Sequence, residues 1–374
     1  MGKKILLITT GGTIAQTKEE SGVASNDSIK KATTLLSHII NKKDIYNIDV
    51  IDTIDAFQID SSNITPDHWT KMIEIIKDNY EKYHAFIITH GTNTLGYTCA
   101  ALSFAMGQIG KPIILTGSQV PYGDFGSDAE TNLENAFRVA AQTRHTIKGV
   151  IAVFGSHIIS GSRVKKTTEF EYDAFKTFNS RASLGRIGRV MRFDEEALKT
   201  HNGYYGTAMR SFELDIRLEF KMKNVISFTE FPGMNQAFFE RLIKGGKKGE
   251  NVEGIILRST GAGDPNIGRE GDGFDNLRRA FIFLKENKIP IIVTTQAPDG
   301  IASMTVNKPG ELARELGAVP AWDMSIESMT TKLAWLLAQD LPYDTVRGEM
   351  LKDYRGEISK RADVEEERSE SALN

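Results

Sequence analysis

The sequence predicts an α/β protein, with a larger N-terminal domain built on a doubly wound parallel sheet and a smaller C-terminal α/β domain. In the N-terminal half, short apolar runs rich in Ile and Val alternate with amphipathic stretches, and each run stops at Gly, Ser or Thr. Buried strands that alternate with helices are typical of βαβ units whose parallel sheet is covered on both faces. Right-handed crossovers then give an open sheet with ligand sites at the carboxyl ends of the strands.

Composition narrows the class of protein. The chain has 374 residues with 46 basic and 49 acidic side chains, so its net charge of −3 gives no electrostatic reason to expect nucleic acid or a membrane as partner. No stretch approaches the roughly 18 apolar residues of a spanning helix. The single cysteine, Cys99, excludes an intramolecular disulfide and is interpreted as a small buried residue. A cytoplasmic location fits this composition.

The elements of the first domain follow from its apolar runs. Four strands are expected in the segments KKILLITTGG, HAFIITHGTN, KPIILTGSQVP and KGVIAVFGS. Helices are expected over Pro66–Tyr83, Leu95–Gln108 and Asp128–Ala141. Thr65 is a suitable N-cap because proline follows it at the first helical position, and Ser127 or Asp128 is expected to cap the third helix.

A smaller unit of the same kind follows. Strands are expected in NVISFTEF, VEGIILRST and IPIIVTTQ, and helices over Asp275–Glu286 and Glu327–Ala338. Periodicity weakens and charges mix between the two halves. We therefore expect a catalytic domain over residues 1–195, a linker over 196–222, a C-terminal domain over 223–358 and a polar tail over 359–374.

Three strand ends have polar, glycine-rich sequence: TTGGTIA at 9–15, THGTNT at 89–94 and TGSQ at 116–119. Glycine after a strand lets the backbone turn sharply and expose its N–H groups, which can stabilise an oxyanion, and a hydroxyl beside a base can act as a nucleophile. A turn with a helix cap is the plain alternative for any one of these motifs. A phosphate loop is disfavoured because GGTIA lacks the Walker lysine and the third glycine of the dinucleotide fingerprint.

TTGGTIA combined with THGTNTLGYT about eighty residues later resembles the L-asparaginase/glutaminase family of threonine amidohydrolases, in its type I-like cytoplasmic and archaeal branch. The segments ILTGSQVP, SDAETNLENAFRVAAQ, ISGSRVKKTTEFEYDAFKTFN, DMSIESMTTKLAWLLAQ and DYRGEIS resemble the same branch. The resemblance thus covers nearly the whole chain, and the two threonine motifs at this spacing are highly specific.

The resemblance implies roles for individual catalytic residues. Thr13 matches the primary nucleophile at the head of a mobile loop, and Thr92 matches the second catalytic threonine. Lys166 matches the lysine that accepts a proton from Thr92. Its neighbour Lys165 would face the opposite way on a strand, so only one of the two can serve. Such a site needs no metal and no cofactor, and His90 is expected to form hydrogen bonds within its loop.

The resemblance also implies a substrate site. Ser61 and Ser62 match residues that bind the substrate α-carboxylate, and Ser118 matches the position whose backbone lies beside the side-chain amide. Thr92 and Asn93 complete the set. The family has aspartate in place of Asn93, and that aspartate meets the substrate α-ammonium.

Asn93 keeps the size of aspartate without its charge. Three explanations of Asn93 compete: the substrate lacks a free α-amino group, the protein is an impaired or engineered variant, or the site tolerates the exchange at some cost in rate. Asp264 is a candidate to supply the missing charge across a subunit interface, against its plainer interpretation as a solvated loop residue. The family's lid tyrosine is also absent from Gln16–Ser28, and Tyr46 and Tyr122 are weak substitutes.

The sequence therefore predicts an asparaginase-type amidohydrolase that releases ammonia from L-asparagine or a related amide, with altered substrate or reduced activity because of Asn93. The alternatives are a catalytically impaired sensor that binds an amino acid or amide, and the ammonia-generating subunit of a tRNA amidotransferase. That subunit has an extra domain before its threonine motif, for which the position of Gly11 leaves no room. The resemblance also implies a homodimer or homotetramer.

Overall fold

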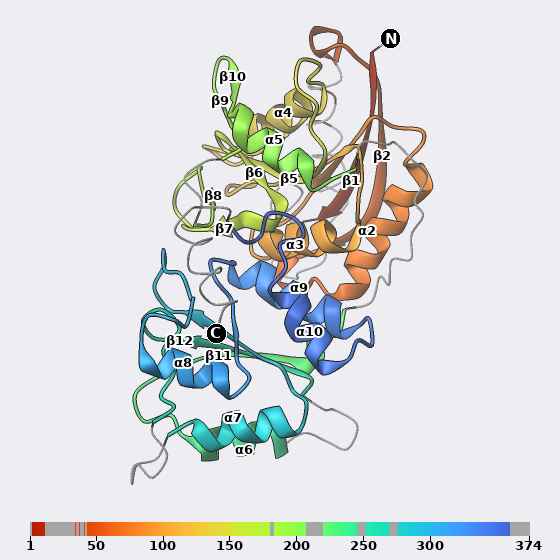
Figure 1. The fold of residues 1–374 in the computed structure, drawn as a ribbon. Coiled ribbons are helices and arrows are strands. Elements are labelled where there is room, and N and C mark those ends of the chain that lie inside the picture. The colour runs from red at the N-terminus through yellow and green to blue at the C-terminus, as the bar shows by residue number, and fades with distance from the viewer. Residues whose placement is uncertain are drawn as a thin grey trace. The chain divides into compact units, whose positions relative to one another are not determined.

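The computed structural model describes residues 2–11, 34, 37, 41, 43–179, 183–206, 220–244, 252–268 and 276–359 (Figure 1). The chain forms two compact units, Met1–Leu218 and Glu219–Asn374. Each unit contains its own sheet with helices packed on it.

The sheet of the first unit has eight strands in the order β10-β9-β6-β5-β4-β3-β1-β2. They are β1 (Lys3–Gly11), β2 (Ile48–Ile59), β3 (Ala85–Thr89), β4 (Pro112–Thr116), β5 (Gly149–Phe154), β6 (His157–Ser160), β9 (Gly185–Ile187) and β10 (Met191–Phe193). The helices are α2 (Pro66–Asn79), α3 (Leu95–Ala105), α4 (Ala129–Ala140) and α5 (Glu195–Gly203), with short 3-10 turns η1 (Lys43–Tyr46), η2 (Ser61–Asn63) and η3 (Gly161–Arg163). A separate hairpin joins β7 (Val164–Lys166) to β8 (Phe175–Thr177).

Strand burial explains why the apolar runs are continuous. Ile5 and Leu7 of β1 lie in one cluster with Leu133 and Phe137 of α4. Leu6, between them, points to the opposite face and is fully buried as well. Both faces of the central strands are therefore covered, which confirms the predicted class of sheet.

The far edge of this sheet differs from the prediction. β5, β6, β9 and β10 pair antiparallel, so the sheet is mixed. These edge strands β6, β9 and β10 have only three or four residues each, too few for an apolar run to reveal them. In addition, the helix α5 occupies the start of the predicted linker, where Leu198 joins the core of the first unit.

Helix starts follow the expected signals. Thr65 is the N-cap of α2 with Pro66 directly after it, as predicted, and the His68 ring accepts a hydrogen bond from the Thr65 N–H. Asp128 is the N-cap of α4, but its carboxylate accepts no hydrogen bond from the first turn of the helix backbone. The Ser127 hydroxyl instead accepts from the N–H of Ala129, over 3.2 Å.

The second unit has a four-stranded parallel sheet in the order β11-β12-β13-β14. Its elements are η4 (Met222–Asn224), β11 (Val225–Thr229), α6 (Gln236–Lys244), β12 (Gly254–Ser259), α7 (Arg278–Glu286), β13 (Ile291–Thr295), α8 (Lys308–Glu315), β14 (Val319–Pro320), α9 (Ile326–Leu337) and α10 (Tyr343–Met350). Strand residues again alternate between two cores: Ile255 packs with residues of α6 and α7, and Ile256 packs with residues of α9 and α10. The predicted α/β architecture of this unit is confirmed.

One smaller expectation is met. Cys99 is fully buried on α3, where burial raises the pKa of its thiol well above the usual value. Within the described ranges, no helix is both long enough and apolar enough to cross a bilayer.

Candidate active site

The polar ends of three neighbouring strands meet at one edge of the first sheet. β1, β3 and β4 run parallel, and their register places Thr9 beside Thr89 and Thr89 beside Thr116. The Thr10 hydroxyl donates to the carbonyl of Thr89 over 2.8 Å, and the His90 N–H donates to the carbonyl of Thr116 over the same distance. The three motifs singled out in the sequence therefore leave the sheet side by side.

Glycine is required where two of these strand ends approach. A Cβ at Gly117 would lie 2.4 Å from the carbonyl oxygen of His90, closer than any side chain tolerates. At Gly11, φ is +90° and a Cβ would lie 2.6 Å from the backbone nitrogen of Ile59. These glycines let the chain turn out of the sheet without separating the strands.

Thr92 and Lys166 are in direct contact. The Lys166 Nζ donates to the Thr92 Oγ1 over 2.8 Å, although 74 residues separate them in the chain. Thr92 follows β3 and is buried, and Lys166 is the last residue of β7 with its side chain 14% exposed. Phe175 fixes the β7–β8 hairpin to the first sheet. It lies opposite Lys166 in the strand register, and its ring centroid lies 4.8 Å from that of Phe154 in β5.

Glu169, which the sequence analysis did not single out, also binds this lysine. Its Oε2 accepts from the Lys166 Nζ over 2.7 Å, so the ammonium lies between a hydroxyl and a carboxylate. Glu169 is three residues further along the chain, in the loop between β7 and β8. The i,i+3 spacing of unlike charges was the available signal, but it is common on any surface.

The serine pair lies beside Asn93. Asp60 caps the short 3-10 turn η2 by accepting from the N–H of Ser62 over 2.7 Å. Asn93 Nδ2 donates to the Ser62 hydroxyl over 2.9 Å, and the Thr94 hydroxyl donates to the carbonyl of Ser61 over 2.7 Å. Two hydrogen bonds thus connect the turn after β2 with the turn after β3.

The Ser118 loop is held by polar side chains of α4. The Asp128 carboxylate accepts from the N–H groups of Gln119 and Val120, each at 3.0 Å. Asn132 donates to the carbonyl of Gly117 over 2.9 Å and to Asp128 over 2.8 Å. The Ser118 hydroxyl itself is buried and has no hydrogen-bond partner among the described residues.

Asn132 reaches a third segment as well. Its Oδ1 accepts from the N–H of Gly155, in the turn between β5 and β6, over 3.0 Å. The next residue, Ser156, donates its N–H to Asp173 over 2.6 Å, and Asp173 belongs to the loop that follows Lys166. A chain of hydrogen bonds therefore connects the Ser118 loop with the lysine hairpin, and nothing in the sequence beyond the helical position of Asn132 indicated it.

His90 is fully buried and forms hydrogen bonds, as expected. Its Nδ1 contacts the carbonyl of Gly91 at 2.7 Å, and its Nε2 contacts the Thr98 hydroxyl at 2.9 Å. Because a carbonyl only accepts, Nδ1 is the protonated nitrogen and Nε2 accepts from Thr98. Burial lowers the pKa of His90 to about 4, so the ring is neutral at pH 7.

Other sequence candidates lie elsewhere or outside the described residues. Thr13 and Gln16–Ser28 are among the residues that the structure does not describe. Tyr46 is bound to Glu134, and burial together with that hydrogen bond raises its pKa to about 12. Tyr122 packs at the margin of the core around α4. Asp264, in the second unit, accepts from the side chain of Asn307 over 2.7 Å.

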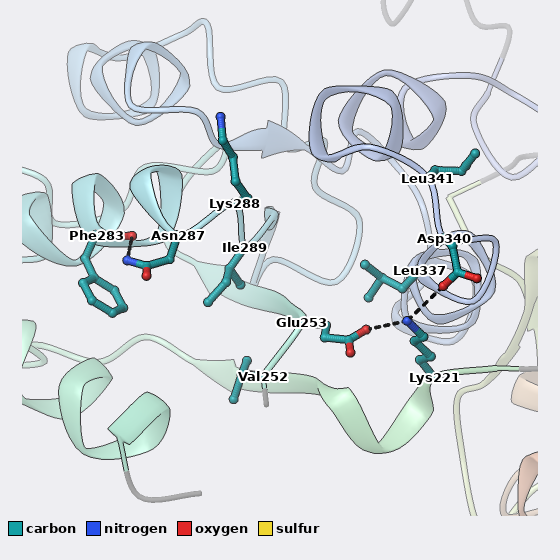
Figure 2. Close-up of a pocket in the computed structure, with 10 residues that line it drawn as sticks. All are labelled: Lys221, Val252, Glu253, Phe283, Asn287, Lys288, Ile289, Leu337, Asp340 and Leu341. Carbon is teal, nitrogen blue, oxygen red and sulfur yellow. Dashed lines mark hydrogen bonds and ion pairs between the residues drawn. The ribbon is translucent and has the colours of Figure 1, made fainter. Parts of the chain in front are cut away.

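The described residues contain no group of three or more His, Cys, Asp or Glu side chains placed to hold a metal ion. A cavity of about 570 Å³ lies in the second unit, and none of the residues proposed for catalysis or substrate binding lines it (Figure 2). On its wall the Lys221 ammonium lies 3.1 Å from Glu253 and 3.5 Å from Asp340 (Figure 2). The hydrogen bond to Glu253 is the largest cause that raises the pKa of Lys221.

Known proteins resemble the chain over almost its whole length. Residues 4–199 match the description "Asparaginase, N-terminal", and residues 224–350 match "Glutaminase/Asparaginase C-terminal domain". The L-asparaginase of Thermococcus kodakarensis is 31% identical over 359 residues, which make up 95% of this chain and 99% of the relative. The solved structure of the thermostable L-asparaginase from that organism superposes with a TM-score of 0.76 at 29% identity, and covers 96% of this chain and 100% of its own.

Two further similarities bear on the alternatives. A glutamyl-tRNA(Gln) amidotransferase subunit of Sulfurisphaera tokodaii is 29% identical over 96% of this chain and 76% of its own length. The structure of a probable cytoplasmic L-asparaginase from Campylobacter jejuni has a TM-score of 0.72 at 21% identity, over 94% of this chain and 100% of its own, and shares the fold.

Fold, strand-end site and similarities together define an amidohydrolase of two α/β domains. The chain belongs to the asparaginase family. The type I-like and archaeal resemblance inferred from its motifs is thereby confirmed.

Proposed function

We propose that this chain hydrolyses the side-chain amide of L-asparagine, or of a related amide, to a carboxylate and ammonia. The proposal rests on the 2.8 Å contact between Lys166 Nζ and Thr92 Oγ1 at the carboxyl edge of the sheet. A threonine hydroxyl attacks a carbonyl only when a base removes its proton, and an amine in contact with the hydroxyl can do so in its neutral form. Thr13 is the proposed primary nucleophile, with Thr92 and Lys166 as the second catalytic pair.

The reaction then has two halves. A threonine oxygen bonds to the amide carbon while its proton passes to the base. The base then gives this proton to the amide nitrogen, so that the C–N bond breaks and ammonia leaves. Water next attacks the resulting ester and restores the hydroxyl. Ser61, Ser62, Thr92, Asn93 and Ser118 are proposed to hold the substrate, and the buried hydroxyl of Ser118 supports this because a bound polar group would satisfy it.

The test is ammonia release from asparagine, glutamine and amides without an α-amino group. Thr92→Val and Lys166→Met are expected to lower kcat by about 10²–10⁴-fold, the usual contribution of acid–base catalysis. Lys165→Met is the matched control, because it removes the same charge from the neighbouring residue of β7 and should keep activity. If Lys165→Met and Lys166→Met behave alike, the assignment of the base is wrong.

The same assay separates the alternatives. A sensor would release no ammonia but would still gain thermal stability when an amino acid or amide binds. A component of a tRNA amidotransferase, as the Sulfurisphaera relative is named, would release ammonia efficiently only together with a partner and its acylated tRNA. Release of ammonia by the isolated chain favours the amidohydrolase.

We also propose that the chain forms a homodimer or homotetramer in the cytoplasm. Phe125 and Phe170 are fully exposed on two loops of the first unit, and Tyr172 connects these loops by donating to the carbonyl of Gly126 over 2.7 Å. Exposed aromatic side chains that lie together favour an interface with another chain. Light scattering should give two or four copies, and Phe125→Ser with Phe170→Ser should reduce that number. The cytoplasmic description of the Campylobacter relative supports the location, which cell fractionation tests.

A further inference from the structure

Lys166 needs more than Thr92 to hold its position. A lysine side chain has a flexible four-carbon stem, and a single hydrogen bond to a hydroxyl leaves its end free to swing. In the structure the Nζ has two partners, Thr92 Oγ1 at 2.8 Å and Glu169 Oε2 at 2.7 Å. The second bond, between unlike charges, gives the amine a second fixed partner and so restricts where it can lie.

Glu169 is also the carboxylate that the structure places on this amine. Asn93, directly after Thr92, has no charge and uses its Nδ2 on Ser62. The two other lysines of the hairpin, Lys165 and Lys176, lie opposite each other in the register of β7 and β8, and both add positive charge near Lys166. The charge that balances the Lys166 ammonium therefore comes from the loop between these strands.

The exposed fractions of Glu169 and Lys166 distinguish a role in placing the amine from a role in stabilising the fold. Glu169 is 68% exposed, and exposed ion pairs contribute little to stability because water screens them. Lys166 is 14% exposed, so its amine lies where the site excludes most of the solvent. Loss of Glu169 should therefore disturb the position of the amine without weakening the fold.

We propose that Glu169 is a positioning residue, whose carboxylate holds the Lys166 amine against the Thr92 hydroxyl. The expected effect of Glu169 on the rate rests on the proposed function. Its expected effect on the position of the Lys166 amine does not. Glu169 acts through Lys166 and is not proposed to touch the substrate.

The experiment compares Glu169→Ala and Glu169→Gln with Glu171→Ala, which removes an exposed carboxylate from the same loop. For Glu169→Ala, kcat with the best amide substrate should fall about tenfold or more while KM stays within about twofold, since the base is displaced and the binding groups are not. Glu169→Gln should recover part of kcat, because its carboxamide oxygen still accepts from Nζ. All three variants should keep the wild-type Tm.

A crystal structure of Glu169→Ala supplies the second measurement. We expect the Lys166 Nζ to lie beyond about 3.5 Å from the Thr92 Oγ1, which is past hydrogen-bond range. The proposal is overturned if the 2.8 Å contact persists in that structure, or if Glu169→Ala has the kcat of Glu171→Ala. Absence of ammonia release by the wild-type chain would refute the proposed function, and the crystal structure would still decide the role of Glu169.

Discussion

Asn93 donates a hydrogen bond from its Nδ2 to the hydroxyl oxygen of Ser62 over 2.9 Å. An aspartate at this position could only accept, so the Ser62 hydroxyl would have to turn and become the donor. Asn93, where the motif resemblance implies an aspartate, is therefore engaged with a residue proposed to bind substrate, and an exchange to aspartate would alter both charge and hydrogen-bond direction.

A carboxylate at position 93 should improve binding of a substrate with an α-ammonium. We expect Asn93→Asp to raise kcat/KM for asparagine about tenfold, mainly through KM, because the side chain is exposed and the gain is smaller than for a buried pair. Amides without an α-amino group should show no gain. Asn63→Asp, at an exposed position of the 3-10 turn, is the control for added charge. An unchanged kcat/KM for asparagine would mean that position 93 is not the ammonium site.

His90 and His201, both buried in the first unit, should make stability depend on pH. Burial lowers the pKa of His90 and of His201 to about 4 from an ordinary value of 6.5. The unfolded chain binds these protons at higher pH than the folded chain, so stability is complete above pH 6.5 and is lost as pH falls towards 4. Each histidine should cost about 2 kcal/mol of unfolding free energy at pH 5.

Urea unfolding at pH 7 and at pH 5 measures this loss. In His201→Gln the difference between the two pH values should shrink by about 2 kcal/mol. NMR titration of the folded protein gives an independent reading, in which the His201 ring stays neutral down to pH 5. A ring that titrates near 6.5 would contradict the prediction.

A buried ion pair should stabilise the second unit. Lys332 Nζ lies 2.7 Å from Glu357 Oε1, and both side chains are fully buried. Burial alone would raise the pKa of Glu357, but the Lys332 ammonium and the N–H groups of Tyr354 and Arg355 outweigh it and hold the pKa below its usual range. The carboxylate is therefore ionised at pH 7 and depends on its partner.

Lys332→Met should lower the unfolding free energy by about 3–5 kcal/mol, because it leaves a buried charge unpaired. Lys332→Met combined with Glu357→Leu should be less harmful than Lys332→Met alone, since neither charge then remains. Lys308→Met, which breaks an exposed pair with Glu311, should have no measurable effect. Denaturant unfolding measures these free energies. Equal losses of unfolding free energy in Lys332→Met and in the double variant would rule out an electrostatic cause.

The strands that the sequence revealed are those buried on both faces. Ile5–Ile8 and Ile291–Val293 read as unbroken apolar runs because helices cover them from both sides. β2, at the edge of its sheet, is only partly buried, and Asp49, Asp52 and Asp55 interrupt its apolar residues every third position, so it escaped detection. The antiparallel strands β9 and β10 are too short to leave a periodic signal.

The residues of the candidate site could be predicted only where they belong to a recognisable sequence motif. The Thr92 segment and Lys166 were identified by resemblance, and the structure brings them into contact. Glu169 and Asn132 were not, because their roles depend on loop and helix positions that local sequence does not specify. The catalytic and substrate-binding assignments themselves remain predictions.

Asn132 touches no residue proposed to react, yet its single carboxamide joins the Ser118 loop, Asp128 and the turn at Gly155. A random mutagenesis screen for lost turnover should therefore yield hits in the middle of α4 as well as at the strand ends. Engineering that aims to change substrate preference has the same reason to leave this helix intact while it diversifies the loops that the helix supports.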